Sequence, residues 1–447
     1  MALKRVHVDK SQLSRRHFLR NSAALAAGAV GFPYIIPGKA LGLDGAVAPS
    51  NKITLASIGV GGQGSYDTRA LMNLPDTQYL AICDVDTGHR ENAKKMIEDY
   101  YKQKDDAASF KGIDTYNDFR EVLARQDIDA VMIATPDFWH AVISVAAAQA
   151  GKDIYCEKPL ANSIPEGRAV VNAVRRYKRV LQTGSHERSR DNARYAAELI
   201  RNGRIGKLHT IRVNQPIDNH GPIPPQPEMP VPPGFDYDMW LGPAQPAPYT
   251  EKRCHFWFRY IYDYSGGEMT DRGAHILDLA QLGHGSDGTT PVEYEGTGWF
   301  PPEGLFNTAM SYSVHCKYAD GVDMFIESVS PRGVKFEGTD GWIFIHVHGG
   351  DLEAEPKSLL SEVLGPNELH LGRSRGHHAD FIANVKSRGE CKAPPEVGHS
   401  SASICHINNI AMLLGRKLRW DPDKEQFIND DEANRMLVRS MRAPWTV

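Results

Sequence analysis

Apolar and polar positions follow two rhythms along the first half of the chain. Short apolar runs predict strands at 53–58, 78–83, 129–134, 152–156 and 180–182. Longer mixed stretches between them predict helices near 62–74, 88–103, 117–125, 137–150 and 165–178. Regular alternation of strands and helices is typical of a parallel sheet that is covered by helices on both faces. Residues 49–182 are therefore expected to form one doubly wound α/β domain.

The pattern changes after Ser185. A proline-rich loop, 220–248, has a length that is usually functional or disordered, and its aromatic residues favour an ordered loop that covers the substrate. Around it, helices are predicted at 189–202, 270–283, 376–388 and 399–415. Strands are predicted at 207–214, 291–299, 309–318, 321–330 and 342–348. Residues 183–447 are therefore expected to form a second domain, with a mostly antiparallel sheet and C-terminal helices.

The first 48 residues differ from the rest of the chain. The sequence SRRHFLR, 14–20, precedes an apolar run of small residues, 23–36. This order resembles a twin-arginine export signal, with Ala46-Val47-Ala48 or the stretch near Ala40 as the cleavage site. The alternative is an amphipathic tail or a membrane anchor, which the short run with its Gly and Pro residues disfavours. We expect residues 1–48 to direct export to the periplasm or another extracytoplasmic space, with no stable membrane span after processing.

Composition limits the partners. The 447 residues carry a formal charge of −4, with 41% apolar and 24% charged residues, which is a globular balance. Because no basic tract persists, nucleic acid is not expected as a partner. The six cysteines are scattered without a C-x-x-C pair, so buried free thiols are expected rather than a disulfide scaffold.

A glycine-rich turn follows the first predicted strand. Its sequence GVGGQG fits G-x-G-x-x-G, and the glycines that we expect to contact a dinucleotide pyrophosphate are Gly59, Gly61, Gly62 and Gly64. A purely structural turn is the alternative. Asp84, at the end of the second strand, is placed to bind the adenosine ribose hydroxyls and to repel a 2′-phosphate. Asp86 adds negative charge but Arg90 offsets it, so NAD is the expected cofactor and NADP stays open.

A second segment on the same sheet edge is ATPDFWH, 134–140. Parallel strands bind ligands beyond their carboxyl ends, so Thr135, Pro136 and His140 are expected to contact the nicotinamide ribose. The alternative is that Pro136 and Asp137 start a helix, which is compatible with this role.

The fifth strand ends in Glu157-Lys158-Pro159. Glu157 and Lys158 are expected beside the cofactor, and partial burial is expected to lower the pKa of Lys158. A second polar group, Asp271 with His275, lies four residues apart on a predicted helix and therefore on one face. A carboxylate beside an imidazole tunes it as a proton acceptor. The alternatives are a surface lysine, a helix-start aspartate and a core histidine.

Other residues are weaker candidates. Trp257, Arg259 and Tyr264 precede that helix, and an aromatic face with a guanidinium suits a sugar ring, although core packing also explains Trp257. His346 and His348 lie two apart on a predicted strand, the geometry of a metal pair, but no third ligand is evident and no metal is predicted. His377 and His378 begin a helix and either reach the substrate or cap it.

The segments GVGGQG, CDVD, ATPDFWHA, CEKPLA and GGEMTDRGAHILD, in this order, resemble the glucose–fructose oxidoreductase / inositol dehydrogenase family (Gfo/Idh/MocA). The resemblance implies a Rossmann domain followed by an α/β domain with a large open sheet, which commonly mediates homodimers or homotetramers. It implies a catalytic group of Lys158, Asp271 and His275, with a cis Lys158–Pro159 bond. It also places His186 and Arg188 where the second domain begins to line the substrate pocket.

These observations predict hydride transfer between a nicotinamide and a sugar or polyol carbon. His275 takes the hydroxyl proton, Lys158 stabilises the oxygen, and Asp271 holds both in register. Because free NAD(P) is scarce outside the cytoplasm, the cofactor is expected to be tightly held and recycled. Two alternatives stay open: an NAD-dependent glycosidase or lyase that forms a transient keto-sugar, and a non-catalytic sugar-binding protein. Relatives that act as glycosidases or lyases often lack the lysine of the Glu-Lys-Pro segment, whereas this chain retains it as Lys158.

Overall fold

The computed structural model describes residues 51–103, 110–216 and 221–447. The chain divides into residues 1–52 and a compact unit, Ile53–Val447, which contains both predicted α/β regions. The proposed export signal at 1–48 lies outside the described residues. In the described part, no helix combines the length and the apolar character that a bilayer crossing needs.

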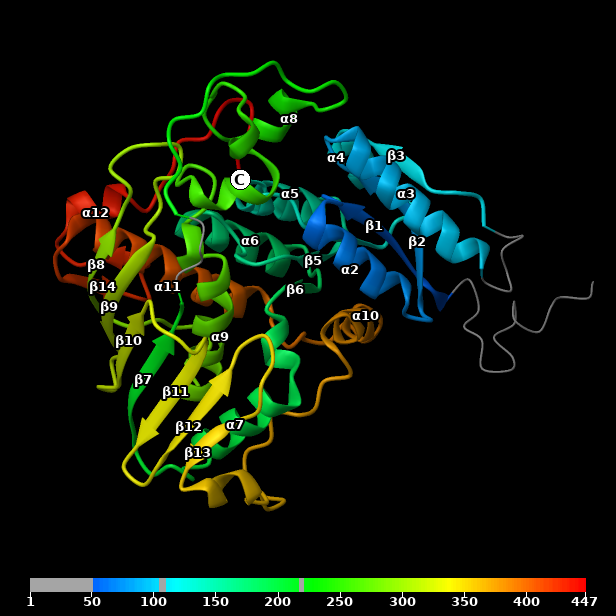
Figure 1. The fold of residues 1–447 in the computed structure, drawn as a ribbon. Helices are drawn as coiled ribbons and strands as arrows, with labels where there is room; N and C mark the ends of the chain where they lie inside the picture. Colours follow the sequence, from blue (N-terminus) through cyan, green and yellow to red (C-terminus); the bar gives the residue numbers. More distant parts are fainter. Residues whose placement is uncertain (1–50, 104–109, 217–220) are drawn as a thin grey trace, which may run out of the picture. The chain divides into compact units, whose positions relative to one another are not determined.

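The first layer of the compact unit is a parallel sheet of six strands in the order β3-β2-β1-β4-β5-β6. Its strands are β1 (Ile53–Ile58), β2 (Thr77–Cys83), β3 (Asp114–Tyr116), β4 (Ala130–Ile133), β5 (Asp153–Cys156) and β6 (Leu181–Thr183). The helices between them are α2 (Gly62–Met72), α3 (Thr87–Lys102), α4 (Phe119–Ala124), α5 (Asp137–Gln149) and α6 (Ile164–Arg176). Figure 1 shows this alternation, which confirms the predicted doubly wound fold.

The strand register aligns the residues that follow the strands. Ile58 pairs with Cys83 on one side and with Ile133 on the other, and Ile133 pairs with Cys156. Since all four strands are parallel, the next residue of each one emerges at the same sheet edge. That edge carries the glycine turn, Asp84, Thr135 and Lys158.

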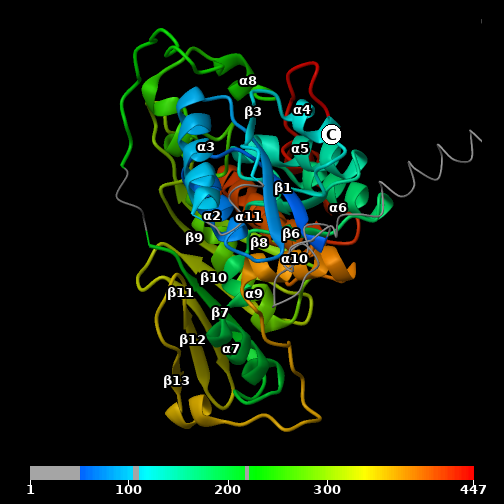
Figure 2. The same ribbon diagram turned by 90° about the vertical axis from the view of Figure 1, so that its right-hand side faces the viewer.

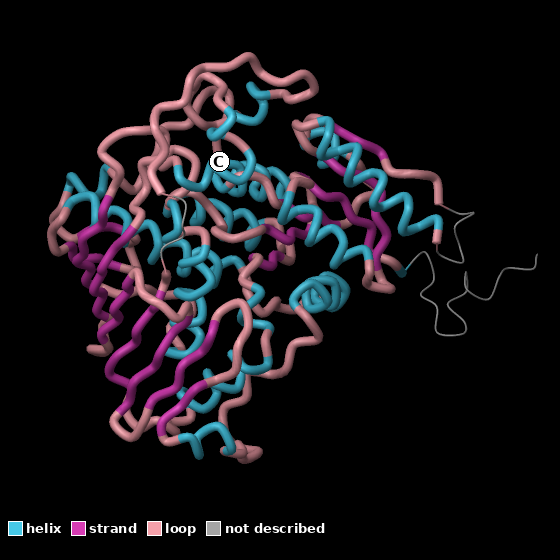
Figure 3. Tube along the Cα trace, viewed as in Figure 1, coloured by secondary structure: helices cyan, strands magenta, loops and turns pink. Residues whose placement is uncertain are grey.

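The second layer is a sheet of nine strands in the order β13-β12-β11-β7-β10-β9-β8-β14-β15. The strands are β7 (Leu208–Asn214), β8 (Glu293–Trp299), β9 (Ser311–Lys317), β10 (Asp323–Glu327), β11 (Gly333–Gly338), β12 (Trp342–His346), β13 (Glu353–Glu355), β14 (Leu418–Asp421) and β15 (Gln426–Phe427). Only β7 and β10 are paired in parallel among the described strand pairs of this sheet. The predicted large, mostly antiparallel sheet is confirmed, and Figure 3 shows its strands in magenta.

Helices cover one face of the large sheet and join it to the first layer. They are α7 (Asp191–Arg201), α9 (Arg272–His284) and α11 (Pro395–Leu414), as Figure 2 shows. The core there contains Ile276, Leu277 and Ile404, all of which are fully buried. The last helices are α10 (His377–Ser387), which packs against α2, and α12 (Asp431–Arg435).

All six cysteines are buried free thiols, as the sequence predicts. The strands β3, β11, β13, β14 and β15 were not predicted. The strands β4 and β5 of the parallel sheet are buried throughout, whereas β3 and β13 are edge strands with mostly exposed residues. An exposed three-residue strand has no apolar periodicity to reveal it.

Candidate active site

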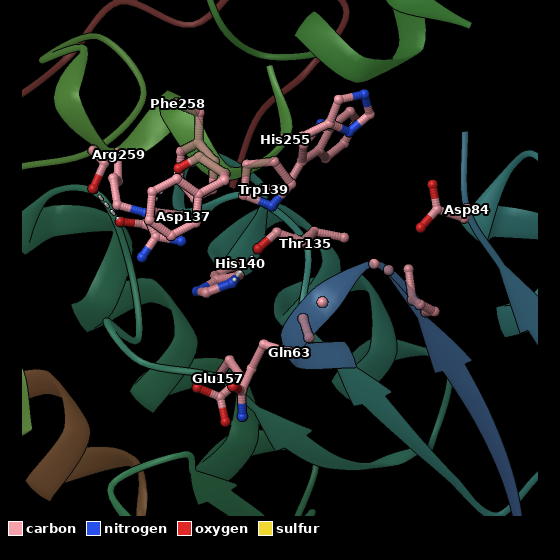
Figure 4. A pocket seen from close by; sticks show the side chains of 18 of the residues that line it. Gln63, Asp84, Thr135, Asp137, Trp139, His140, Glu157, His255, Phe258 and Arg259 are labelled. Atoms are coloured by element: carbon pink, nitrogen blue, oxygen red, sulfur yellow. Dashed lines mark hydrogen bonds between the residues drawn. The ribbon is translucent and has the colours of Figure 1, made fainter. Parts of the chain in front are cut away.

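A cavity of about 790 Å³ lies at the carboxyl edge of the parallel sheet. It is lined on one side by the residues after β1, β2, β4 and β5, and on the other by the segment 255–275. Figure 4 shows Asp84 at one end and Asp137 with Arg259 at the other, with Thr135 between them. This volume and this mixed lining are typical of cofactor and small-molecule sites.

The glycine turn is built for close backbone approach. Gly59 has a φ of +82°, and a Cβ there would lie 2.6 Å from the carbonyl oxygen of Ala134. A Cβ on Gly64 would lie 2.0 Å from the carbonyl oxygen of Gly59. Gly61 caps α2 at the cavity wall, and Gly62 begins the helix at a point where an added Cβ would meet no described atom within 4 Å. Gly59, Gly61 and Gly62 line the cavity, while Gly64 sits behind them. The turn and the helix N-terminus fit the pyrophosphate of a dinucleotide.

Asp84 is anchored to this turn. Its carboxylate accepts hydrogen bonds from the Val60 N–H (2.8 Å) and the Asp86 N–H (2.9 Å). Asp86 caps α3 through the Gly88 N–H. Arg90 donates to the Asp84 carbonyl and to Asn117 Oδ1 (3.1 Å), so its guanidinium is engaged with the chain. The sequence places the Asp84 carboxylate and the Arg90 guanidinium in competition for the charge at this site. In the structure, the carboxylate lines the cavity.

The loop 221–248 closes over this same end. The Thr87 N–H donates to Gly234 O (2.9 Å), and the Asp236 N–H donates to Val85 O (2.9 Å). Its short helix α8 (Tyr237–Leu241) contributes Met239 and Trp240 to the cavity lining. The loop is ordered over the described residues, as predicted. It lies beside Asp84, however, so it covers the cofactor end rather than the substrate end that the sequence analysis expected.

Thr135, Pro136 and His140 line the middle of the cavity. His140 is 1% exposed, with Nδ1 2.7 Å from Pro159 O and Nε2 2.9 Å from Thr135 O. Burial lowers its pKa to about 4, so the ring is neutral, and its single N–H donates to one of these two carbonyl oxygens. Thr135 Oγ1 is buried and has no hydrogen-bond partner among the described residues. A free hydroxyl at this place fits a ribose or carboxamide group of the cofactor.

Lys158 and Asp271 meet across the cavity. The Lys158 Nζ lies 2.5 Å from Asp271 Oδ1, and Arg259 Nη1 lies 2.5 Å from Asp271 Oδ2. The Lys158–Pro159 bond is cis, as the resemblance implies. Burial opposes the charge on Asp271, but the charges of Lys158 and Arg259 hold the pKa of Asp271 far below its usual range. A carboxylate between two cations is thus fixed at the base of the site.

The expected fall in the pKa of Lys158 is wrong. Burial alone lowers the pKa of Lys158, but the charges of Asp271 and Glu157 more than offset it, and the net pKa is raised. Burial of Lys158 can be inferred from the strand pattern, whereas the carboxylate contacts that offset it exist only in the folded chain. Lys158 is therefore a permanent ammonium at neutral pH.

His275 lies in the first turn of α9 and is 4% exposed. Burial and the charge of Lys158 lower its pKa well below 6.5, so the ring is neutral. Its Nδ1 has no hydrogen-bond partner in the described part of the chain. Asp271 directly precedes α9 and turns its carboxylate to Lys158, so the predicted aspartate–imidazole pair on one helix face is replaced by an aspartate–lysine pair.

Behind the glycine turn lies a buried carboxylate pair, Glu157 and Asp67. Burial raises the pKa of Glu157 to about 8 and that of Asp67 to about 7. His378 Nε2 lies 2.9 Å from Asp67 Oδ1, and the ring stacks on Tyr155. Glu157 reaches the cavity lining, and Figure 4 shows it below the other labelled side chains beside Gln63. Of the two histidines that begin α10, His378 therefore supports this pair rather than reaching a substrate.

The predicted substrate residues divide into two groups. His186 and Arg259 line the cavity. Arg188 does not: its guanidinium is 4% exposed and bound to Asp278 (2.6 Å) and Asp287. Trp257 and Tyr264 also lie outside the lining, because both pack into the core beside Phe306 and Phe138 respectively. The sequence could not separate an aromatic that faces a ligand from one that faces the core.

His346 and His348 do not form a pair. β12 ends at His346, which lies 2.6 Å from Glu353 Oε1. His348 has a φ of +66°, which turns it away from that face and into the cavity, beside His186 and His275. Sequence reasoning also missed Asp137, which is buried at the cavity wall and accepts a hydrogen bond from Ser265 Oγ (2.6 Å). No spacing in the sequence indicates that His348 or Asp137 lies at the cavity.

Two family models match the chain. Residues 53–185 match the oxidoreductase family's NAD-binding Rossmann fold, and residues 224–447 match its C-terminal alpha/beta domain. The chain belongs to the Gfo/Idh/MocA oxidoreductase family.

Named relatives cover only part of this chain. It is similar to an alpha-N-acetylgalactosaminidase from Shewanella oneidensis, 28% identical over 44% of this chain and 44% of that protein. It is also similar to a myo-inositol 2-dehydrogenase from Thermotoga maritima, 26% identical over 53% of this chain and 62% of that protein. The chain thus spans roughly half the length of such relatives.

The fold resembles that of a crystal structure of the WlbA dehydrogenase from Bordetella pertussis in complex with NADH and UDP-GlcNAcA. The TM-score is 0.61 at 15% identity, over 83% of this chain and 99% of that chain. At this identity the similarity concerns the fold alone.

Proposed function

We propose that this protein is an NAD-dependent oxidoreductase that moves a hydride between a nicotinamide and a hydroxyl-bearing carbon of a sugar, polyol or glycoside. One observation carries the proposal. Lys158, from the parallel sheet, and His275, from the second domain, line a single cavity together with the glycine turn and Asp84. A fixed ammonium and a neutral imidazole in one cavity are what removal of a hydroxyl proton requires.

The residues divide the work as follows. A bound nicotinamide supplies the hydride acceptor. His275, which is neutral and lines the cavity, takes the hydroxyl proton. The Lys158 ammonium donates to the same oxygen and stabilises its developing negative charge. Asp271, held between Lys158 and Arg259, keeps that ammonium in place.

The proposed cofactor is NAD rather than NADP. The Asp84 carboxylate faces the cavity, and the Arg90 guanidinium is engaged with the Asp84 carbonyl and Asn117. A 2′-phosphate would meet this carboxylate, and the arginine would have to leave three acceptors, Asp84 O, Asn117 Oδ1 and Thr87 Oγ1, to offset it. Another group beside Asp84 in the cavity lining that can carry positive charge is His89, whose Nδ1 lies 3.5 Å from Asp84 Oδ2. Equal affinity for NAD and NADP would contradict this choice.

We also propose a tightly held, internally recycled cofactor in an exported protein. The twin-arginine pattern at 14–20 supports export of a folded, loaded protein. The loop 221–248 supports retention, because it is hydrogen-bonded to the segment beside Asp84 and contributes to the cavity wall. A chain that keeps its cofactor would restore it with a second substrate or with a later step on the same substrate.

A second candidate function is glycoside cleavage through a transient keto-sugar. The similarity to the Shewanella oneidensis alpha-N-acetylgalactosaminidase favours it. The retained Lys158 favours the plain dehydrogenase. NAD-dependent release of nitrophenol from an aryl glycoside would reverse this ranking. A non-catalytic sugar-binding protein is disfavoured by the intact group of Lys158, Asp271 and His275.

We keep the proposal that the chain assembles as a homodimer or homotetramer. The face of the nine-stranded sheet away from α9 and α11 carries half-buried residues such as Phe325 and Trp342. Sedimentation of the purified chain tests this directly.

The experiment for the proposed function begins with the native protein. Mass spectrometry should find NAD or NADH bound in a near-stoichiometric amount, and a monosaccharide screen should then change the nicotinamide absorbance. Protein that arrives empty and binds NAD only at millimolar concentration would contradict tight retention. No absorbance change over a broad panel of sugars would favour the non-catalytic alternative.

A further inference from the structure

Three side chains at the wall of the cavity converge on one point. They are His186 and Glu187, at the start of a 3₁₀ turn after β6, and His348, in the turn after β12. One ligand atom from each lies within 4.8 Å of the others. The Glu187 Oε1 is 3.3 Å from His186 Nε2 and 3.5 Å from His348 Nδ1.

The carboxylate at the centre of this group is buried without full satisfaction. The Glu187 side chain is 1% exposed, and both its oxygens lack a hydrogen-bond partner within the described ranges. Arg190 Nε stands 3.2 Å from Oε1 as an ion pair from the solvent side. Oε1 is therefore close to two imidazoles and one guanidinium, whereas Oε2 is buried without a neighbour of this kind among the described residues. A buried carboxylate oxygen without a partner has room for a further group.

The distances fit a metal ion. Two ligands of a tetrahedral Zn²⁺, each about 2.0–2.2 Å from the ion, lie roughly 3.3–3.5 Å apart. Both histidine-to-glutamate distances already have this value. The two imidazoles need a small approach, which the exposed turn around His348 permits.

We propose that His186, Glu187 and His348 bind a divalent transition-metal ion such as Zn²⁺ or Co²⁺ at the substrate end of the cavity. Two imidazoles and one carboxylate with open positions are the ligand set of zinc sites that also bind water or substrate. His186 and His348 both line the cavity, so the open positions face it. Of His346 and His348, for which the sequence predicts no metal, only His348 takes part in this site.

The site lies beside the proposed base. The rings of His186 and His275 are 4.6 Å apart between centroids, and those of His275 and His348 are 5.3 Å apart. An ion here would orient a substrate oxygen next to the one from which His275 takes a proton. That placement rests on the proposed function, whereas metal binding itself does not.

The test is titration of the metal-free, full-length protein with Co²⁺, followed by its visible absorption, and with Zn²⁺ by calorimetry. The expected result is one saturable site, with affinity reduced about tenfold or more in both Glu187→Gln and His348→Ala. His346→Ala is the matched control, because it removes the histidine at the end of β12 that pairs with Glu353; it should leave the affinity unchanged.

A second cluster, Asp86, His89 and His255, lies at the other end of the cavity and could also take the ion. The variant His255→Ala therefore separates the two. Binding that is lost in His255→Ala and kept in His348→Ala would overturn the proposal, as would the absence of saturable binding. Because His348 is exposed, its variant should fold even if Glu187→Gln does not. Hydride transfer to bound NAD, measured separately, shows whether the proposed function fails independently.

Discussion

The two ends of the cavity are built in different ways. The Asp84 end is framed by the glycine turn and the residues after β2, where a backbone N–H holds the carboxylate, and the loop 221–248 closes over it. The Lys158 end is assembled from segments more than a hundred residues apart, and charged side chains define it. The geometry of the Asp84 end depends on close backbone packing. The geometry of the Lys158 end depends on the balance between its positive and negative charges.

This difference predicts which kind of substitution each end of the cavity tolerates least. Added volume should harm the glycine end, since its atoms have no room to move. Removal of one charge should harm the other end, since two cations share one carboxylate. The following changes test that contrast, beginning with the largest expected effect.

Asp271→Asn leaves the Lys158 ammonium and the Arg259 guanidinium facing each other without a counter-charge. We expect a loss of about 3 kcal/mol in the free energy of unfolding, because the three groups are largely buried and breaking such a pair is costly. Urea denaturation measures it. Asp191→Asn, which removes an exposed partner of Arg194, is the control and should cost less than about 1 kcal/mol. Equal losses in the two variants would refute a charge-balanced site.

Gly64→Ala places a methyl group 2.0 Å from the Gly59 carbonyl oxygen, which is backbone and cannot swing aside. We expect about 1–3 kcal/mol of destabilisation and weaker NAD binding, because the turn must shift. Gly62→Ala is the matched control for stability, since no described atom lies within 4 Å of its added carbon, although Gly62 itself lines the cavity. Urea denaturation compares the two variants, and calorimetric titration with NAD measures the affinity of Gly64→Ala. Unchanged NAD affinity in Gly64→Ala would show that the turn is not a pyrophosphate site.

Asp84→Asn keeps the shape of the side chain and removes its charge. The preference for NAD over NADP should fall by about tenfold, corresponding to roughly 1.4 kcal/mol, because repulsion of a 2′-phosphate is lost. Fluorescence titration with each cofactor reports it. Asp86→Asn, at the cap of α3, should change the ratio less. A ratio that stays constant in Asp84→Asn would remove the basis for assigning NAD.

The smallest effect concerns pH. The neutral ring of His275 is the proton acceptor, and its pKa is well below 6.5, so the acceptor form persists as the pH falls through that value. The pKa of Lys158 is raised above 10.5, so the ammonium persists as the pH rises. We therefore expect no loss of oxidation rate attributable to either group between about pH 6.5 and 10. Asp137 and Asp67, whose pKa values burial raises to about 7, and Glu157, whose pKa burial raises to about 8, are the neighbours to replace as controls. An inflection near pH 6.5 that survives in Asp137→Asn, Asp67→Asn and Glu157→Gln would contradict the assignment.

The Asp84 end of the cavity could be predicted from the sequence more fully than the Lys158 end. β1 matches its predicted bounds, and the glycine turn and Asp84 follow directly from neighbouring residues. The Lys158–Asp271 contact spans 113 positions and is visible only once both sheets are formed. The raised pKa of Lys158, the ion pair that withdraws Arg188 and the left-handed turn at His348 depend on the same tertiary contacts. Local sequence patterns predict the fold and the Asp84 end of the cavity. The Lys158 end depends on ion pairs between residues that are far apart in the sequence.

The most direct test of the central claim is a single turnover. Wild-type protein loaded with NAD and mixed with its sugar substrate should form one equivalent of reduced nicotinamide per site. Lys158→Ala and His275→Ala should bind NAD with nearly wild-type affinity and form it about 10²–10³-fold more slowly. A rate that stays at the wild-type value in both variants, or a loss of NAD binding equal to the loss of rate, would contradict the account.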